Sequence, residues 1–119
     1  MELIALLSSG KGTWGQVSGL IKKGEWEKII LLGPKFASEF KSEMPFDFIE
    51  YDDSKPLAAL KDFFLKKLRE KISSDFSSEV ALSIASGTGK EHMALISALL
   101  SIPVGVRFVA LTREGIVYL

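Results

Sequence analysis

The chain has 119 residues and a mass of 13.1 kDa, so we expect a single domain over residues 1–119 with one hydrophobic core. Its fifteen basic and fifteen acidic side chains balance, so we expect no general attraction for polyanions and no long nucleic acid as a partner. The absence of cysteine excludes disulfides, thiolate metal sites and a cysteine nucleophile. Because the chain also lacks a basic signal-peptide start and any apolar run of about 18 residues, we expect a cytoplasmic protein without membrane contact.

The N-terminal segment predicts a strand, a turn and a helix. Residues 3–9, LIALLSS, suit a strand, and the GKG sequence of residues 10–12 suits a tight turn. Thr13 and Gln16 match the S/T-x-x-E/Q capping box, and Gly24 follows the last expected helical residue. A helix is therefore predicted from the turn to Gly24.

Two further strands follow. The Ile29–Leu32 run is wholly apolar, which is typical of a strand buried on both faces. Pro34 can begin a short helix with Phe36 and Phe40 on one face. Residues 46–51 alternate but carry mixed apolar and acidic side chains on both faces, so we expect a strand near a sheet edge.

The longest helix is predicted in the middle of the chain. Asp52, Asp53 and Ser54 are candidates for its N-cap. The polar residues 73–79 are expected to connect it to the next strand. Its apolar stripe at helical spacing consists of Leu57, Leu60, Phe64, Leu68 and Ile72.

A second Gly-rich loop follows the apolar run of residues 80–85. Thr88 and Glu91 form another capping-box pattern and open a nearly apolar helix, which residues 101–103 should end. The last residues predict two strands joined by the TREG turn, which is too short for a parallel crossover and so predicts an antiparallel hairpin.

Alternating strands and helices predict an α/β fold, a Rossmann-like three-layer sandwich. We expect a mainly parallel six-stranded sheet of order 3-2-1-4-5-6, with the C-terminal antiparallel β-hairpin at its end. This order makes the first and fourth strands neighbours. The two Gly-rich loops should then flank the crevice where strand order reverses, which is where such folds bind ligands.

Both loops lead into a helix N-terminus and carry one lysine, a pattern that favours a bound anion. We therefore expect a phosphate-bearing ligand. The expected ligand-binding residues are Ser8, Ser9, Gly10, Lys11, Gly12, Thr13, Ser86, Gly87, Thr88, Gly89 and Lys90.

Several other chemistries fit less well. A Walker A loop would need glycine where Ile84 stands and Ser or Thr where Glu91 stands. The string from Gly10 to Gly15 matches G-x-G-x-x-G, but no acidic residue follows the second strand, so NAD and FAD are not expected. A Ser-His-Asp triad is conceivable around His92, the only histidine, yet no G-x-S-x-G elbow exists. We expect no metal and no cofactor.

The second loop, SIASGTGKEHMALISALL, resembles the CARF (CRISPR-associated Rossmann-fold) domain family. The similarity lies in a small-residue and Gly-Thr-Lys turn that opens an apolar helix, with a final β-hairpin behind it. Ser8 and Ser9 after the first strand extend it. One difference is Gly89, which separates Thr88 from Lys90 where the family commonly has Thr and Lys adjacent.

The resemblance implies a homodimer that binds a cyclic oligoadenylate on its two-fold axis, as a stand-alone sensor in CRISPR-associated defence. One alternative is a ring nuclease, a metal-independent phosphodiesterase in which the ligand's 2′-hydroxyl attacks the adjacent phosphate. Its catalytic candidates are Lys11, Lys90 and His92. Another is a non-catalytic scaffold that docks to a larger effector, which predicts an exposed apolar surface.

Overall fold

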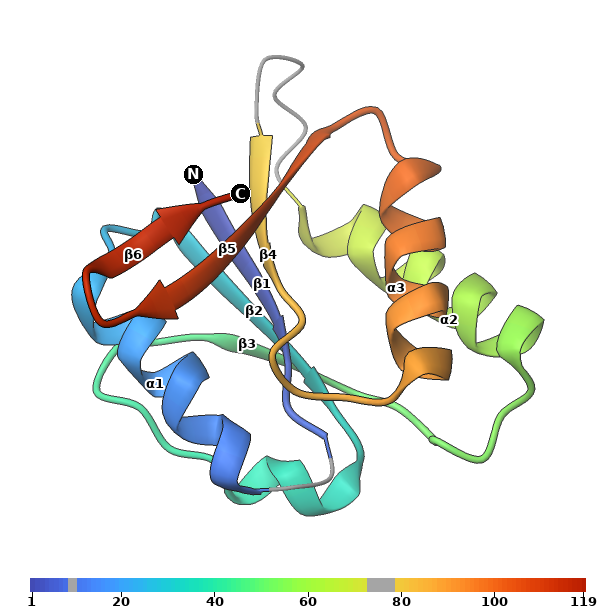
Figure 1. The fold of residues 1–119 in the computed structure, drawn as a ribbon. Coiled ribbons are helices and arrows are strands. Elements are labelled where there is room, and N and C mark those ends of the chain that lie inside the picture. Colours follow the sequence, from blue (N-terminus) through green and yellow to red (C-terminus); the bar gives the residue numbers. More distant parts are fainter. Residues whose placement is uncertain (9–10, 73–78) are drawn as a thin grey trace.

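The computed structural model describes residues 1–8, 11–72 and 79–119, with Lys11 described by its backbone alone. Over these ranges the chain forms an α/β fold (Figure 1). The strands are β1 (Glu2–Leu6), β2 (Lys28–Gly33), β3 (Asp47–Glu50), β4 (Glu79–Ser83), β5 (Gly105–Thr112) and β6 (Gly115–Tyr118). The helices are η1 (Lys11–Thr13), α1 (Trp14–Lys23), η2 (Lys35–Glu39), α2 (Leu57–Lys71) and α3 (Gly89–Leu100), where η marks a 3-10 helix.

The strands form one six-stranded sheet in the order β3-β2-β1-β4-β5-β6. β1 lies at its centre and pairs in parallel with both β2 and β4, so that Ile4 lies opposite Ile30 and Leu82. β6 alone runs antiparallel, paired with β5 through the hairpin. The predicted fold class, strand order and C-terminal hairpin are therefore confirmed.

Helices cover the sheet on both faces, α2 and α3 on one side and α1 on the other (Figure 1). The alternation of side chains along β1 divides the core between these layers. Ile4 and Leu6 belong to the cluster that includes α2 and α3, and Leu3, Ala5 and Leu7 belong to the cluster that includes α1. All five are fully buried. Each such Leu or Ile contributes about 1.5–3 kcal/mol relative to an exposed one, so the centre of the sheet is a rigid base for the loops that follow it.

The β5–β6 hairpin packs toward α1. The first half of β5, Gly105–Phe108, pairs with β4, and its second half pairs with β6. A Cβ at Gly19 of α1 would lie 2.2 Å from a methyl carbon of Leu111. Glycine at this position therefore allows α1 and the hairpin to approach closely. At the hairpin turn, Gly115 has φ +107°, which favours glycine.

The predicted capping box of α1 is wrong. Thr13 has φ −82° and ψ −11° and makes no capping hydrogen bond with its side chain. Residues 11–13 form η1, so Thr13 already has helical dihedral angles instead of the extended ones from which a side chain caps. The helix does end before Gly24, where a Cβ would lie 2.4 Å from the ring of Trp26.

The predicted N-cap of α2 is also wrong. Pro56 occupies the cap position, and Asp52 instead accepts hydrogen bonds from the amide and hydroxyl of Ser54, at 3.0 and 2.7 Å. The apolar stripe of α2 is buried except for Leu57, which is 39% exposed. Side chains on a helix lean toward its N-terminus, so Leu57, the first residue of α2, projects past the packed layer.

The short helix expected after Pro34 is present, as the 3-10 helix η2. Phe40 is buried and Phe36 is 44% exposed, and both rings contact Trp14 of α1. The expected edge strand is confirmed, because β3 is the terminal strand of the sheet.

Candidate functional site

The two predicted loops meet at the carboxyl ends of β1 and β4. The backbone amide of Ser8, two residues after the end of β1, donates to the hydroxyl of Ser86, three residues after the end of β4, at 2.9 Å. Both residues are buried. The first loop is also held from the other side, because the indole N–H of Trp14 donates to the carbonyl of Ser8 at 3.1 Å. The two loops are therefore fixed against each other where the strand order reverses.

Glu91, in the first turn of α3, connects these two loops to Tyr51, the residue after β3. It is 1% exposed, and its carboxylate accepts hydrogen bonds from three donors. The Ser8 hydroxyl lies 2.7 and 2.9 Å from its two oxygens, the Thr88 amide lies 2.8 Å from Oε1, and the Tyr51 hydroxyl donates to Oε2. The predicted capping box is confirmed, since Thr88 Oγ1 also accepts from the Glu91 amide at 3.2 Å.

These contacts fix the ionisation of the cluster. Burial by itself raises the pKa of Glu91, but the hydrogen bonds from Tyr51, Ser8 and Thr88 outweigh it and hold the pKa below its usual value. Burial, together with the hydrogen bond to Glu91 and its negative charge, raises the pKa of Tyr51. At neutral pH the pair is thus a carboxylate and a neutral phenol. Glu91 is a structural anion and a poor general base.

Glycines 87 and 89 shape the entry to α3 differently. Gly87 has φ +113°, and a Cβ there would lie 3.0 Å from Nε2 of His92, so the turn itself requires glycine. Gly89 has neither a positive φ nor any atom within 4 Å of a Cβ, and Gly12 in the first loop is the same. Neither the dihedral angles nor the packing requires glycine at these two positions, and the same holds for Gly15 in α1.

Lys90 and His92, two of the catalytic candidates, contact backbone carbonyls. The Lys90 ammonium donates to the carbonyls of Asp53 and Lys55 at 2.7 and 2.8 Å, which joins α3 to the loop between β3 and α2. Nε2 of His92 lies 2.9 Å from the carbonyl of Ser86, so it carries the proton and donates. Both side chains therefore stabilise the backbone of the loops beside α3.

The remaining predicted residues are only partly placed. Ser9 and Gly10 lie outside the described residues, and so does the side chain of Lys11, the third catalytic candidate. Gly12 and Thr13 lie in η1, directly before α1. The described part of the site therefore depends mainly on Ser8, on Tyr51 and on residues 86–92.

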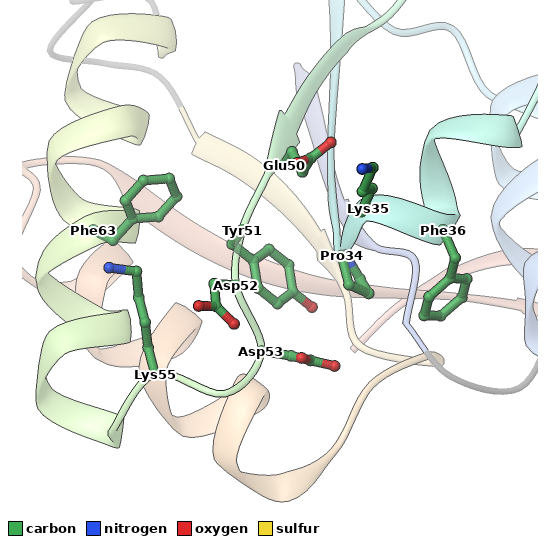
Figure 2. Close-up of a pocket in the computed structure, with 9 residues that line it drawn as sticks. All are labelled: Pro34, Lys35, Phe36, Glu50, Tyr51, Asp52, Asp53, Lys55 and Phe63. Carbon is green, nitrogen blue, oxygen red and sulfur yellow. The ribbon is translucent and has the colours of Figure 1, made fainter.

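A pocket of about 500 Å³ adjoins this cluster, and the sequence patterns did not indicate it. It lies at the carboxyl end of β3, between η2 and α2 (Figure 2). Figure 2 shows Phe36 and Phe63 at opposite sides of it, with Asp52 and Asp53 between them. Its lining residues are Pro34, Lys35, Phe36, Glu50, Tyr51, Asp52, Asp53, Lys55 and Phe63.

Two contacts make the pocket continuous with the Gly-rich loop. Tyr51 lines the pocket and donates its hydroxyl proton to Glu91. Lys90 holds the carbonyls of Asp53 and Lys55, two residues of the pocket rim. A ligand that spans both places would thus meet backbone amides and a lysine at one end, and aromatic rings with carboxylates at the other.

No group of three or more His, Cys, Asp or Glu side chains that could hold a metal ion occurs among residues 1–8, 11–72 and 79–119. None of the helices in these ranges is long and apolar enough to cross a membrane.

No protein-family model matches the sequence, and no curated protein matches it. The structure establishes the fold of the chain. It is a Rossmann-like α/β fold whose mainly parallel sheet ends in the antiparallel β5–β6 hairpin.

Proposed function

We propose that this protein binds a nucleotide at the carboxyl edge of β1 and β4, with a phosphate at the N-terminus of α3. The observation that carries the proposal is the hydrogen bond from Ser8 to Ser86, which joins two Gly-rich loops beside a helix N-terminus. The amides of Gly89 and Lys90 are in the first turn of α3 and have no intrahelical acceptor. Such amides, with the positive end of the helix dipole, attract phosphate.

The charges near this position have to be weighed. Glu91 opposes an anion, but its carboxylate is turned toward Ser8, Thr88 and Tyr51 and receives a hydrogen bond from each. The Lys90 ammonium provides a positive charge on the same turn of α3. With a dipole equivalent to about half a positive charge at the helix N-terminus, the charges of the first turn of α3 favour a phosphate there. The carboxylates of Asp52 and Asp53, which lie near Lys90 and Tyr51, oppose an anion on the pocket side.

The adjoining pocket suits the nucleoside part of the ligand. Its volume of about 500 Å³ falls within the range of about 300–1,000 Å³ that is usual for small-molecule sites. Phe36 is 44% exposed and Trp14 stacks on one face of its ring, with ring centroids 6.1 Å apart, so a base would stack on the opposite face. The exposed carboxylates of Asp53 and Glu50 are acceptors, which suits the hydroxyls of a ribose or the amino group of a base.

Within this class, the resemblance to CARF domains favours a cyclic oligoadenylate as the ligand and a homodimeric sensor in CRISPR-associated defence as the role. Two copies related by a two-fold axis would present the same two loops to a ring with the same symmetry. Binding without cleavage is better supported than cleavage. The described catalytic candidates, Lys90 and His92, already donate hydrogen bonds to backbone carbonyls.

Isothermal calorimetry with cyclic tetra- and hexa-adenylate, without metal, tests this proposal, and chromatography of the nucleotide afterwards tests cleavage. Gly89→Ala is the informative variant, because its Cβ has free space in the fold but would obstruct a ligand at the backbone. Gly15→Ala is the matched control, since it has equal space and is not among the predicted ligand-binding residues.

We expect Gly89→Ala to weaken binding at least about tenfold, which is the loss of one charge-assisted hydrogen bond, and Gly15→Ala to leave it unchanged. An intact ring after incubation supports a sensor, and linear products would establish a ring nuclease instead. If neither ring binds the wild-type protein, the proposed ligand is wrong.

A further inference from the structure

The ammonium group of Lys90 is committed to the loop between β3 and α2. Its Nζ lies 2.7 Å from the carbonyl oxygen of Asp53 and 2.8 Å from that of Lys55. An ammonium group has three N–H donors, so these carbonyls leave at most one of them for a ligand. A phosphate at the first turn of α3 would therefore feel the charge of Lys90 but receive few of its hydrogen bonds.

The loop of residues 52–55 depends on Lys90 for its position. Asp52, Asp53 and Ser54 are exposed. The amide and hydroxyl of Ser54 donate to Oδ1 of Asp52, and the amide of Lys55 donates to the Asp52 carbonyl at 3.2 Å, so these hydrogen bonds stay inside the loop. Within the part of the chain that the structure describes, the hydrogen bonds that join this loop to another element are those from Lys90.

Lys55 extends this contact into the pocket. Its carbonyl is held by Lys90, and its own ammonium lies 5.6 Å from the ring centroid of Phe63, which lines the pocket on the α2 side (Figure 2). A cation at this distance is attracted to the face of the ring. The ammonium of Lys67 lies 5.7 Å from the same centroid, but Lys67 belongs to α2 and is not among the residues that line the pocket.

We infer that Lys90 is a positioning residue for the nucleoside pocket and acts through Lys55. By holding the backbone of the loop, Lys90 keeps the Lys55 ammonium beside Phe63, where it is a hydrogen-bond donor to the base. The inference rests on the proposed function, because it assigns how the pocket of that site is kept ready for its ligand. It gives the lysine of the Gly-rich loop a task at the nucleoside end of the ligand as well as a charge near the phosphate.

The charges around the loop agree with this arrangement. Hydrogen bonds from Ser54 and, after them, the positive charges of Lys55 and Lys90 hold the pKa of Asp52 below its usual value. Asp52 is therefore a carboxylate at neutral pH and attracts both ammonium groups. Glu50 and Asp53 also line the pocket, so a loop released from Lys90 would offer the Lys55 ammonium other carboxylates in place of Phe63.

A cycle of single and double substitutions tests the inference by calorimetry with cyclic tetra-adenylate. Lys90→Met removes the ammonium that holds the loop, and Lys55→Met removes the ammonium in the pocket but keeps the carbonyl that Lys90 binds. We expect each substitution to weaken binding at least about fivefold and the double variant to bind no more weakly than the weaker single variant, because residues of one network do not act additively. Lys90→Arg, which keeps the charge and the donors, should restore most of the affinity.

Lys67→Met is the matched control, since Lys67 contacts the same ring from outside the pocket and should leave the affinity unchanged. Effects of Lys90→Met and Lys55→Met that add in full would overturn the inference, because the two lysines would then act separately. A loss in the Lys67 control equal to that in Lys55→Met would also overturn it.

Hydrogen exchange of the protein without ligand separates this inference from the proposed function. Lys90→Met should speed exchange at the amides of Ser54 and Lys55 at least about fivefold, because the hydrogen bonds of a released loop open more often, whereas Lys67→Met should not. Unchanged exchange in Lys90→Met would overturn the inference whatever the ligand. The expected exchange in a protein that binds no nucleotide would contradict the proposed function alone.

Discussion

Replacement of Glu91 by glutamine should destabilise the fold, although the two side chains have the same shape. The carboxylate accepts hydrogen bonds from Ser8, Tyr51 and Thr88 and is 1% exposed. A hydrogen bond to a charged group contributes about 1.5–3 kcal/mol and one between neutral groups about 0.5–1.5 kcal/mol. Each of the three hydrogen bonds therefore contributes about 1 kcal/mol less in the glutamine variant. The glutamine amide also presents N–H groups to the hydroxyls of Ser8 and Tyr51, which donate to the carboxylate in the wild type. One of these hydroxyls must therefore rotate so that it accepts a hydrogen bond.

Over the three hydrogen bonds the expected loss of stability is about 3 kcal/mol. Part of it is regained, because a neutral amide costs less to bury than a carboxylate. We therefore expect the free energy of unfolding to fall by about 2–3 kcal/mol, a large part of the roughly 5–15 kcal/mol typical of such proteins. Urea denaturation at pH 7, followed by far-UV circular dichroism, measures it. Glu70→Gln, at an exposed position on α2, is the control and should change the value by less than about 0.5 kcal/mol.

The same substitution has a pH signature. The pKa of Glu91 is lowered in the fold, so its contribution to stability is present above the unfolded-state pKa of about 4.3 and is lost as pH falls through the folded-state value. The difference between wild type and Glu91→Gln should therefore shrink below about pH 4. Equal stabilities at pH 7, or a difference that does not depend on pH in this range, would refute the assigned role of Glu91.

Three other substitutions test the surroundings of Glu91. Gly87→Ala should lower the free energy of unfolding by about 1–3 kcal/mol, because φ is +113° and the new Cβ meets His92, and an unchanged urea midpoint would contradict this. Thr88→Ala removes the N-cap acceptor of α3 and should cost about 0.5–2 kcal/mol in the same assay. Tyr51→Phe should cost about 1.5–3 kcal/mol at pH 7. Because the pKa of Tyr51 is raised in the fold, its contribution is complete below the unfolded-state pKa of about 10 and declines as pH rises further, so wild type and Tyr51→Phe should converge in stability in alkaline solution.

The sheet could be predicted because its signals are local and repeated. Apolar runs such as Ile29–Leu32 alternate with helical patterns, and the right-handed crossover rule then leaves few strand orders. The capping box of Thr88 and Glu91 was also correct, since both residues lie within one helical turn. The cap predicted at Thr13 failed because η1 gives that residue helical angles, which a four-residue pattern does not reveal.

The cluster around Glu91 could not be predicted in the same way. Tyr51 is 40 residues from Glu91 and reaches it from β3, and Ser8 is 83 residues away. Only the folded sheet brings these residues together. For the same reason Lys90, expected at the mouth of the crevice, could not be matched in advance with the carbonyls of Asp53 and Lys55, and the pocket beside them was missed.

The most direct test of the proposed site is a titration of the ¹⁵N-labelled protein with unlabelled cyclic tetra-adenylate, followed by the backbone amide resonances. We expect the amides of Gly87, Gly89 and Lys90 to shift first and most, and resonances around Asp53 to follow. Absence of any shift at high ligand concentration, or shifts confined to residues remote from the carboxyl ends of β1 and β4, would contradict the proposed site.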